Sequence, residues 1–134
     1  MARSQSPKRG SGRLSRSADF ERVYRQGRSV ANRYLVVYLF PRGNDGDAQA
    51  LSEPPRLGLS VSRKVGGATD RNRIKRLLRE AFAVEGRQVP AGTDVVIVAR
   101  PDIVDLAERE GLEGVQRALA DLTTPAESAP SAGP

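Results

Sequence analysis

Residues 62–82 read SRKVGGATDRNRIKRLLREAF, a strongly basic stretch. Residues 63–79 within it hold seven Lys or Arg and a single acidic residue, Asp70. A helix from about Asp70 to Ala83 places five apolar side chains on one stripe, at the three- and four-residue spacing of an α-helix: Ile74, Leu77, Leu78, Ala81 and Phe82. The pattern therefore predicts an amphipathic helix whose apolar stripe faces the core.

The outward face of this predicted helix carries cations about one turn apart. Its residues form two neighbouring rows, first Arg71, Lys75 and Arg79, then Asn72 and Arg76. Glu80 can pair with Arg76 four residues away, or loosely with Arg73, which leaves most of the charges to repel one another. A negatively charged partner would relieve this repulsion, whereas the ordinary alternative is a solvated basic face.

The length of 134 residues allows one domain with tails. Its net charge of +6 hides a gradient, because residues 1–100 hold 20 basic and 9 acidic side chains, and residues 101–134 hold 2 and 7. A positive field gives sequence-independent affinity for polyanions, and nucleic acid is the usual partner of a small basic domain. Membrane lipid is the weaker candidate, since no apolar run approaches the roughly 18 residues of a membrane span.

The chain has no Cys and no His. This composition excludes disulfides, thiolate or imidazole metal sites, and the usual nucleophile and general-base systems. If the protein belongs to a hydrolase, the chemistry is expected elsewhere, and we predict no catalytic residue and no protein metal site. The basic N-terminus lacks the apolar region of a secretory signal, which predicts a cytoplasmic protein without a membrane partner.

Composition divides the chain into three segments. Residues 1–13 are Ser, Gly, Pro, Lys and Arg with almost nothing apolar, which predicts a disordered basic arm. Residues 14–122 carry the periodic patterns of a single α/β domain, and the Pro- and Ala-rich residues 123–134 are expected to form a disordered tail. Within the domain, Pro41 to Pro55 gathers turn-forming residues and predicts a long mobile connection.

A short helix is predicted from Ser17, which suits the N-cap, to Gly27, which suits the C-terminus. Phe20, Val23 and Tyr24 share one face of this helix, and Val23 is assigned to the core. A strand follows from Arg28 to Phe40 and another from Arg56 to Ser62.

Alternation gives each of these two strands one aliphatic face. Leu35, Val37 and Leu39 form that face in the first strand, opposite Tyr34, Val36 and Tyr38. Leu57, Leu59 and Val61 form it in the second, opposite Gly58, Ser60 and Ser62. If the strands pair, the Tyr and Ser sides form an open floor, walled by Phe20 and Tyr24, on which single-stranded bases can stack. Ordinary packing of the two Tyr side chains is the alternative.

The C-terminal part of the domain has three patterns. Val95 to Ala99 is apolar on both faces and predicts an interior strand. Asp102 to Glu110 is acidic and is expected to be irregular or a single helical turn. A last amphipathic helix is indicated by a stripe of four residues: Leu112, Val115, Leu119 and Leu122.

Three blocks of the chain together resemble the protein component of bacterial ribonuclease P. They are SVANRYLVVYLF (29–40), RLGLSVSRKVGGATDRNRIKRLLREAF (56–82) and DVVIVAR (94–100). The similarity extends from about Leu14 to Leu122, which would make this segment an RNA-binding domain. Its signature is the Arg-Asn-Arg run followed by Lys-Arg and Arg-Glu on one helix, with Ser-Arg-Lys upstream.

The resemblance implies an α/β (α+β) two-layer sandwich of order α-β-β-β-α-β-α, ribosomal-protein-S5-domain-2-like, with the basic helix in a left-handed β-α-β crossover. Pattern alone would favour the right-handed form, which accounts for about 98% of such crossovers. One of the three consecutive strands is weakly marked in the sequence. It is either a split of residues 28–40 or part of residues 41–55.

In this family the RNA subunit removes the 5′ leader of precursor tRNA by Mg²⁺-dependent hydrolysis, and the non-catalytic protein helps to bind leader and metal. The implied cofactor is Mg²⁺, held mainly by the RNA subunit and substrate. The implied partners are the catalytic RNA and precursor tRNA, with no protein partner required. By position, the residues facing the catalytic RNA are Arg63, Lys64, Arg71, Asn72, Arg73, Lys75, Arg76 and Arg79. Those lining the leader cleft are Phe20, Tyr24, Arg33, Tyr34 and Tyr38.

Two departures from the family pattern lie beside the basic helix. Gly67 stands where the family often has Asn, and Thr69-Asp70 replaces a more apolar pair. Asp70 either caps the helix or alters a nearby metal or phosphate contact. A structural RNA-binding protein of ribosomal type is the alternative function, although such a protein needs no groove for an unpaired strand. A DNA-binding helix-turn-helix would need a short helix where the Leu57 to Val61 strand is expected.

Overall fold

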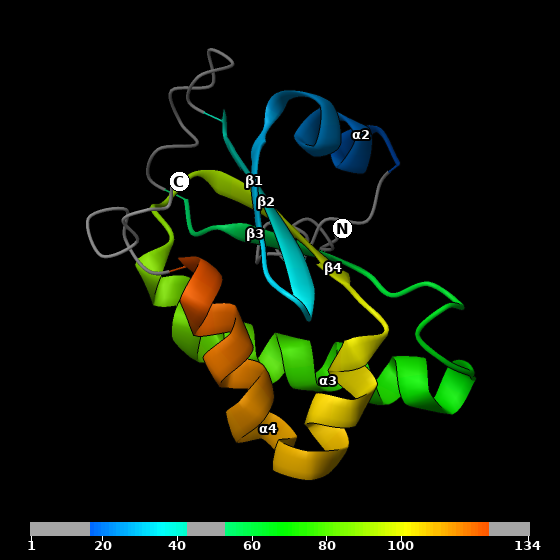
Figure 1. Cartoon of the computed structure of the whole chain (residues 1–134). Helices are drawn as coiled ribbons and strands as arrows, with labels where there is room; N and C mark the ends of the chain where they lie inside the picture. The colour runs from blue at the N-terminus through cyan, green and yellow to red at the C-terminus, as the bar shows by residue number, and fades with distance from the viewer. Residues whose placement is uncertain (1–16, 43–52, 124–134) are drawn as a thin grey trace, which may run out of the picture.

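A four-stranded sheet organises the computed structural model, which describes residues 17–42 and 53–123 (Figure 1). The elements follow the order α2 (Ser17–Gln26), β1 (Arg28–Ala31), β2 (Leu35–Pro41), β3 (Arg56–Ser60), α3 (Ala68–Glu85), the 3₁₀ turn η3 (Gly86–Gln88), β4 (Thr93–Ala99) and α4 (Asp102–Thr123). The predicted order α-β-β-β-α-β-α is confirmed. The predicted arm, residues 43–52 of the predicted connection and residues 124–134 of the predicted tail lie outside the described residues. Thr123, assigned to that tail, is instead the buried last residue of α4.

The strands lie in the order β1-β2-β4-β3. β2 is antiparallel to both of its neighbours, and β3 is parallel to β4, so that β3, α3 and β4 form the expected β-α-β unit. The conditional pairing of the first two predicted strands is wrong, because β4 lies between β2 and β3. β4 takes this place because it is apolar on both faces and can be buried from both sides.

The weakly marked third strand arises from a split of residues 28–40. The side chain of Asn32 fixes the turn between β1 and β2, because its Oδ1 accepts hydrogen bonds from the backbone N–H groups of Tyr34 and Leu35, each at 2.9 Å. Its Nδ2 donates to the carbonyl of Ala118 in α4, also at 2.9 Å. One polar side chain therefore both breaks the strand and attaches the resulting hairpin to the helical layer.

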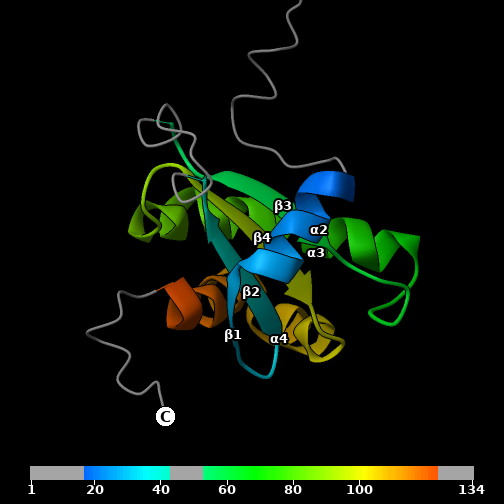
Figure 2. The same ribbon diagram turned by 90° about the horizontal axis from the view of Figure 1, so that it is seen from above.

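Helices cover the two faces of the sheet unequally. α3 and α4 form a layer on one face, and α2 lies on part of the opposite face (Figures 1 and 2). The main core between the sheet and this layer contains the stripe predicted for the basic helix, with Ile74, Leu78 and Ala81 buried and Leu77 and Phe82 packed against them. The smaller core beneath α2 consists of Val23, Phe40 and Val96.

The acidic segment Asp102 to Glu110 is helical, so the prediction of an irregular or single-turn segment is wrong. Ile103, Leu106 and Ala107 are buried at helical spacing against the main core, and this burial outweighs the charge of the segment. α4 is broken at Gly111, which has φ 62° and ψ −148°, a backbone conformation that favours glycine. The second half of α4 then buries Val115 and Leu119 of the predicted final helix.

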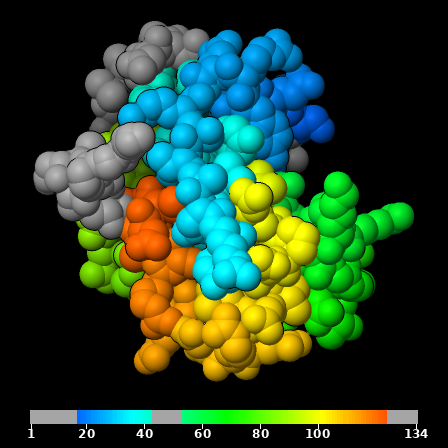
Figure 3. All heavy atoms as spheres, viewed as in Figure 1, coloured from blue at the N-terminus to red at the C-terminus, as the bar shows by residue number. Residues whose placement is uncertain are grey.

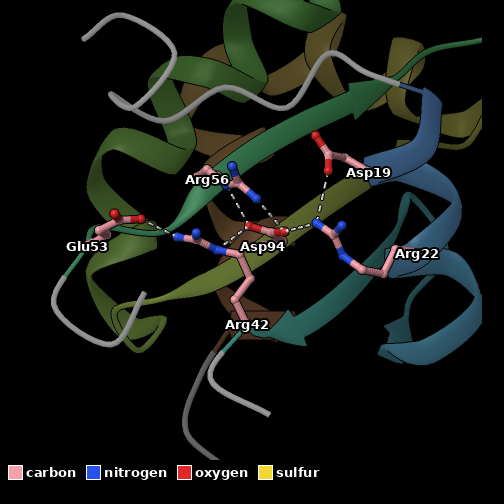
Figure 4. Close-up of polar contacts among 6 residues, drawn as sticks. All are labelled: Asp19, Arg22, Arg42, Glu53, Arg56 and Asp94. Carbon is pink, nitrogen blue, oxygen red and sulfur yellow. Dashed lines mark hydrogen bonds and ion pairs between the residues drawn. The ribbon is translucent and has the colours of Figure 1, made fainter. Parts of the chain in front are cut away.

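One end of the sheet is held by the carboxylate of Asp94, which is fully buried at the start of β4 (Figure 4). Arg56 donates from Nε and Nη2 to the two carboxylate oxygens at 2.9 and 3.0 Å. Arg22 of α2 donates to Oδ2 at 3.0 Å, and Nε of Arg42 lies 3.1 Å from Oδ1. Residues of α2, β3 and β4 and the residue after β2 therefore meet at one carboxylate, and the hydrogen bond from Arg56 to Asp94 raises the pKa of that guanidinium.

We predict that Asp94→Asn lowers the free energy of unfolding by about 3 to 5 kcal/mol, because the amide leaves several partly buried guanidinium groups without a counter-charge. Asp121→Asn, an exposed position in α4, is the matched control and is expected to change stability by less than about 0.5 kcal/mol. Urea unfolding at neutral pH measures both variants. Equal stability of the two would show that the Asp94 contacts do not support the fold.

Candidate nucleic-acid interface

Five cations on and before α3 form the candidate nucleic-acid interface, here named the cationic ridge: Arg63, Lys64, Lys75, Arg76 and Arg79. All are exposed except Lys75, which is half-buried. Within residues 17–42 and 53–123, their side chains make no hydrogen bond and no ion pair. The segment before α3 and the first turns of that helix (green) project from the body of the molecule in Figures 1 and 3. The ridge is therefore both unneutralised and accessible.

The Arg-Asn-Arg run at the start of α3 does not point in one direction. Asn72 is exposed, but Arg71 donates from Nε to the carbonyl of Gly66 at 3.2 Å. Arg73 is half-buried and donates from Nη2 to the carbonyl of Ala107 in α4 at 3.4 Å. The run thus combines one outward amide with two arginines that contact their own protein.

The two departures from the family pattern differ in their packing. A Cβ at Gly67 would meet no atom within 4 Å, so the Asn common in the family would find room there. Gly67 also occupies the N-cap position of α3, which has no side-chain cap. Asp70 therefore lies in the first turn of α3 and not at the cap. The helix dipole stabilises a carboxylate in the first turn.

Three rings on the opposite side of the sheet form a second candidate surface, here named the aromatic cluster: Phe20, Tyr24 and Tyr38. The ring centroids of Phe20 and Tyr24 are 6.2 Å apart, and those of Tyr24 and Tyr38 are 4.9 Å apart, both in edge contact. Tyr24 is 40% exposed, whereas Phe20 and Tyr38 are half-buried against the smaller core. The structure therefore brings together three of the five residues predicted for the leader cleft.

The floor beside the aromatic cluster consists of residues that are paired across three neighbouring strands, β2, β4 and β3. Tyr38 is paired with Val96, and Val96 with Gly58, so this row runs from β2 to β3. The next row on the same face is Val36, Val98 and Ser60, all half-buried. Of the Tyr and Ser side chains expected on this floor, Tyr38 and Ser60 lie in these rows, with Val96 and Val98 of β4 between β2 and β3.

Arg33 and Tyr34 lie away from the aromatic cluster. Tyr34 packs against the main core on the side of α3 and α4, so the prediction that it shares a face with Tyr38 is wrong. Its position in the turn before β2 explains the difference, because strict alternation begins only with the strand. Arg33 donates to Asp102 of α4 at 2.9 Å, and this hydrogen bond raises the pKa of its guanidinium.

The side chains that support the aromatic cluster were not identified from the sequence. Arg22 and Asp94 are 72 positions apart, and Arg22 also donates to Asp19 at 3.0 Å. The available signal was a lone carboxylate at the start of an otherwise apolar strand, DVVIVAR. Such a residue is buried only when it is paired.

The fold and the two surfaces define a small basic α/β domain with a cationic helix on one side of its sheet and an aromatic cluster on the other. Comparison with known proteins identifies the family. The sequence profile of ribonuclease P matches residues 9–123. The ribonuclease P protein component of Bacillus pumilus is 38% identical over 104 residues, which cover 78% of this chain and 82% of the relative.

Solved structures agree with the sequence match. The ribonuclease P protein of Staphylococcus aureus superposes with a TM-score of 0.65 at 36% identity, over 80% of this chain and 91% of that one. The Thermotoga maritima protein gives a TM-score of 0.66 at 34% identity, over 80% and 90%. The chain belongs to the ribonuclease P protein family. No helix in the described ranges is long and apolar enough to cross a membrane.

We predict that Arg73→Ala lowers the free energy of unfolding by about 0.5 to 1.5 kcal/mol, because it removes the hydrogen bond from α3 to the Ala107 carbonyl. Arg76→Ala removes the same charge three residues later, from an exposed side chain, and is expected to change stability by less than about 0.5 kcal/mol. Thermal or urea unfolding compares them directly. A larger loss for Arg76→Ala would contradict this assignment.

Proposed function

We propose that this protein binds the catalytic RNA of ribonuclease P through the cationic ridge and holds the 5′ leader of precursor tRNA on the aromatic cluster. It thereby supports Mg²⁺-dependent removal of the leader by the RNA, and carries no catalytic residue itself. The observation that carries this proposal is the row of cations on α3 that have no partner among the described residues, in a chain of this family.

Binding to the RNA subunit is favoured by the electrostatics of the ridge. A cation that is already paired with a carboxylate adds little binding free energy when it contacts a phosphate. An unpaired cation can displace a counterion from RNA and so adds affinity. Arg76 and Arg79 are exposed and unpaired among the described residues, and Asn72 beside them adds an amide donor and acceptor. Arg71 and Arg73 would support this surface by bracing α3 rather than by direct contact.

Binding of the leader is favoured by the chemistry of the aromatic cluster. An unpaired strand offers the faces of its bases, and an aromatic side chain stacks on any of them. Tyr24 and Tyr38 present two such rings next to a half-buried floor of small residues. The cluster is separated from the cationic ridge by the sheet, so one molecule has two surfaces for two different RNA segments.

Magnesium would be held mainly by the RNA subunit and the substrate. Among the described residues, no group of three or more Asp or Glu is placed to hold a metal ion, and the buried carboxylate of Asp94 is occupied by guanidinium groups. The chain's own part in metal binding is then indirect. Its cations would neutralise RNA phosphates and so reduce the Mg²⁺ concentration that the RNA needs.

For the RNA subunit, we predict that Arg76→Ala weakens binding and lowers the slope of log affinity against log salt by about 0.7 to 0.9, the value for one lost phosphate contact. Arg87→Ala, an exposed cation in η3 outside the ridge, is the control and should leave the slope unchanged. Filter binding to transcribed ribonuclease P RNA over a salt series gives both slopes. Identical slopes for the two variants would assign Arg76 to solvated surface.

For the leader, we predict that Tyr38→Ala weakens binding of leader-bearing precursor tRNA to the reconstituted enzyme by about 1 to 3 kcal/mol, the range for one base stacked on a ring. Binding of mature tRNA should hardly change. Tyr34→Ala removes the same side chain from the other side of the sheet, and should leave the ratio of the two affinities intact.

Cleavage by the same preparations tests the proposal as a whole. The protein without RNA should cleave nothing, and its addition should raise cleavage by the RNA at low Mg²⁺. Leader removal by the protein alone, or equal rates with and without it at every Mg²⁺ concentration, would overturn the proposed function. Equal losses for precursor and mature tRNA in Tyr38→Ala would remove the aromatic cluster from it.

A further inference from the structure

Arg22 connects α2 to the rest of the protein. Its Nη2 lies 3.0 Å from Asp94 Oδ2 and 3.0 Å from Asp19 Oδ1 (Figure 4). Its Cζ lies 5.4 Å from the centre of the Phe40 ring. Within the described ranges, it makes the one side-chain hydrogen bond from α2 to another element. Charge, hydrogen bonding and the ring of Phe40 therefore converge on a single side chain.

The same turn of α2 carries the rings of the aromatic cluster. Phe20 lies two residues before Arg22, and Tyr24 two residues after it. Apart from Arg22, α2 packs on the sheet through Val23, its one fully buried residue, through the half-buried Phe20, and through the edge contact of Tyr24 with Tyr38. These are non-directional packing contacts, which fix the distance of a helix from a sheet better than they fix its rotation, whereas the hydrogen bond from Arg22 to Asp94 is directional. The rotation decides where Tyr24 stands relative to Tyr38.

Asp94 can lose Arg22 without losing its counter-charge. Arg56 contacts both carboxylate oxygens, and Arg42 contacts Oδ1 as well. The side chain of Arg22 is 27% exposed, so water can replace part of what it donates. A change at residue 22 should therefore loosen α2 while the buried carboxylate and the sheet end around it stay paired.

We infer that Arg22, held by Asp94, is a positioning residue for leader binding: it sets the rotation of α2 that brings Tyr24 against Tyr38. The inference rests on the proposed function only for its RNA readout. The geometry of the rings in the free protein tests it separately. Arg22 acts through the aromatic rings and needs no contact with RNA.

The test compares Arg22→Met with Arg25→Met in the full chain. Both remove one positive charge from α2, but Arg25 is exposed and, in the part of the chain that the structure describes, its one ion pair is within the helix, with Glu21 at 3.5 Å. Arg22→Met should change the tyrosine near-UV circular dichroism of the free protein, because the edge contact of Tyr24 and Tyr38 alters. In the reconstituted enzyme it should lower the preference for leader-bearing over mature tRNA at least about fivefold, the equivalent of a weak base stack. Arg25→Met should do neither.

Each other outcome overturns the inference in an identifiable way. An unchanged tyrosine spectrum in Arg22→Met would show that Arg22 does not set the ring geometry. Equal loss of preference in both variants would show that charge, not position, matters. Equal weakening of both RNAs by Arg22→Met would reveal a merely structural role. If Tyr38→Ala lowers the leader preference and Arg22→Met does not, only the role of Arg22 is refuted. If Tyr38→Ala has no effect, the proposed leader site is refuted, and the tyrosine spectrum still decides whether Arg22 sets the ring geometry.

Discussion

The buried carboxylate of Asp94 is the constraint on which the arrangement of this domain depends. A charge with no exposed surface is tolerated only when partners replace its hydration, and here Arg22, Arg42 and Arg56 do so. Asp19 and Glu53 pair with the outer sides of two of these arginines, so three positive and three negative groups balance. Because the partners come from α2, the residue after β2 and the start of β3, correct pairing at Asp94 requires all of them to be placed together.

The sheet separates the two surfaces that we propose for RNA binding. β2 and β4 each have one face toward the layer of α3 and α4 and the other toward α2. Two tyrosines four residues apart lie on opposite sides of the sheet. Tyr38 belongs to the aromatic cluster, whereas Tyr34 packs against the main core. The residue type is the same, and only the position relative to the start of β2 decides the role.

Periodicity predicted the elements that are stabilised locally. The stripe from Ile74 to Phe82 and the doubly apolar Val95 to Ala99 both carry their own signal, and both were placed correctly. Contacts between distant segments carried no such signal. Asn32 splits a strand through its own side chain and a carbonyl 86 residues away, and Arg22 reaches Asp94 over 72 residues. In Asp102 to Glu110, the many acidic residues of a nine-residue segment outweighed the helical spacing of its few apolar residues, so the sequence did not predict a helix there.

The acidic C-terminal quarter of the chain has charge enough to neutralise the cationic ridge, yet the described part of the structure keeps the two apart. In α4, Asp102 pairs with Arg33, Asp105 with Arg109, and Glu110 with Arg109 and Arg117. These pairs are exposed and add little stability, but they engage three carboxylates of α4 with arginines outside the cationic ridge. The ridge on α3 is left with its positive field, which acts over about a Debye length of 8 Å at physiological salt. Among the described residues, no acid of α4 pairs with the cationic ridge, so this positive field is not cancelled by ion pairs from α4.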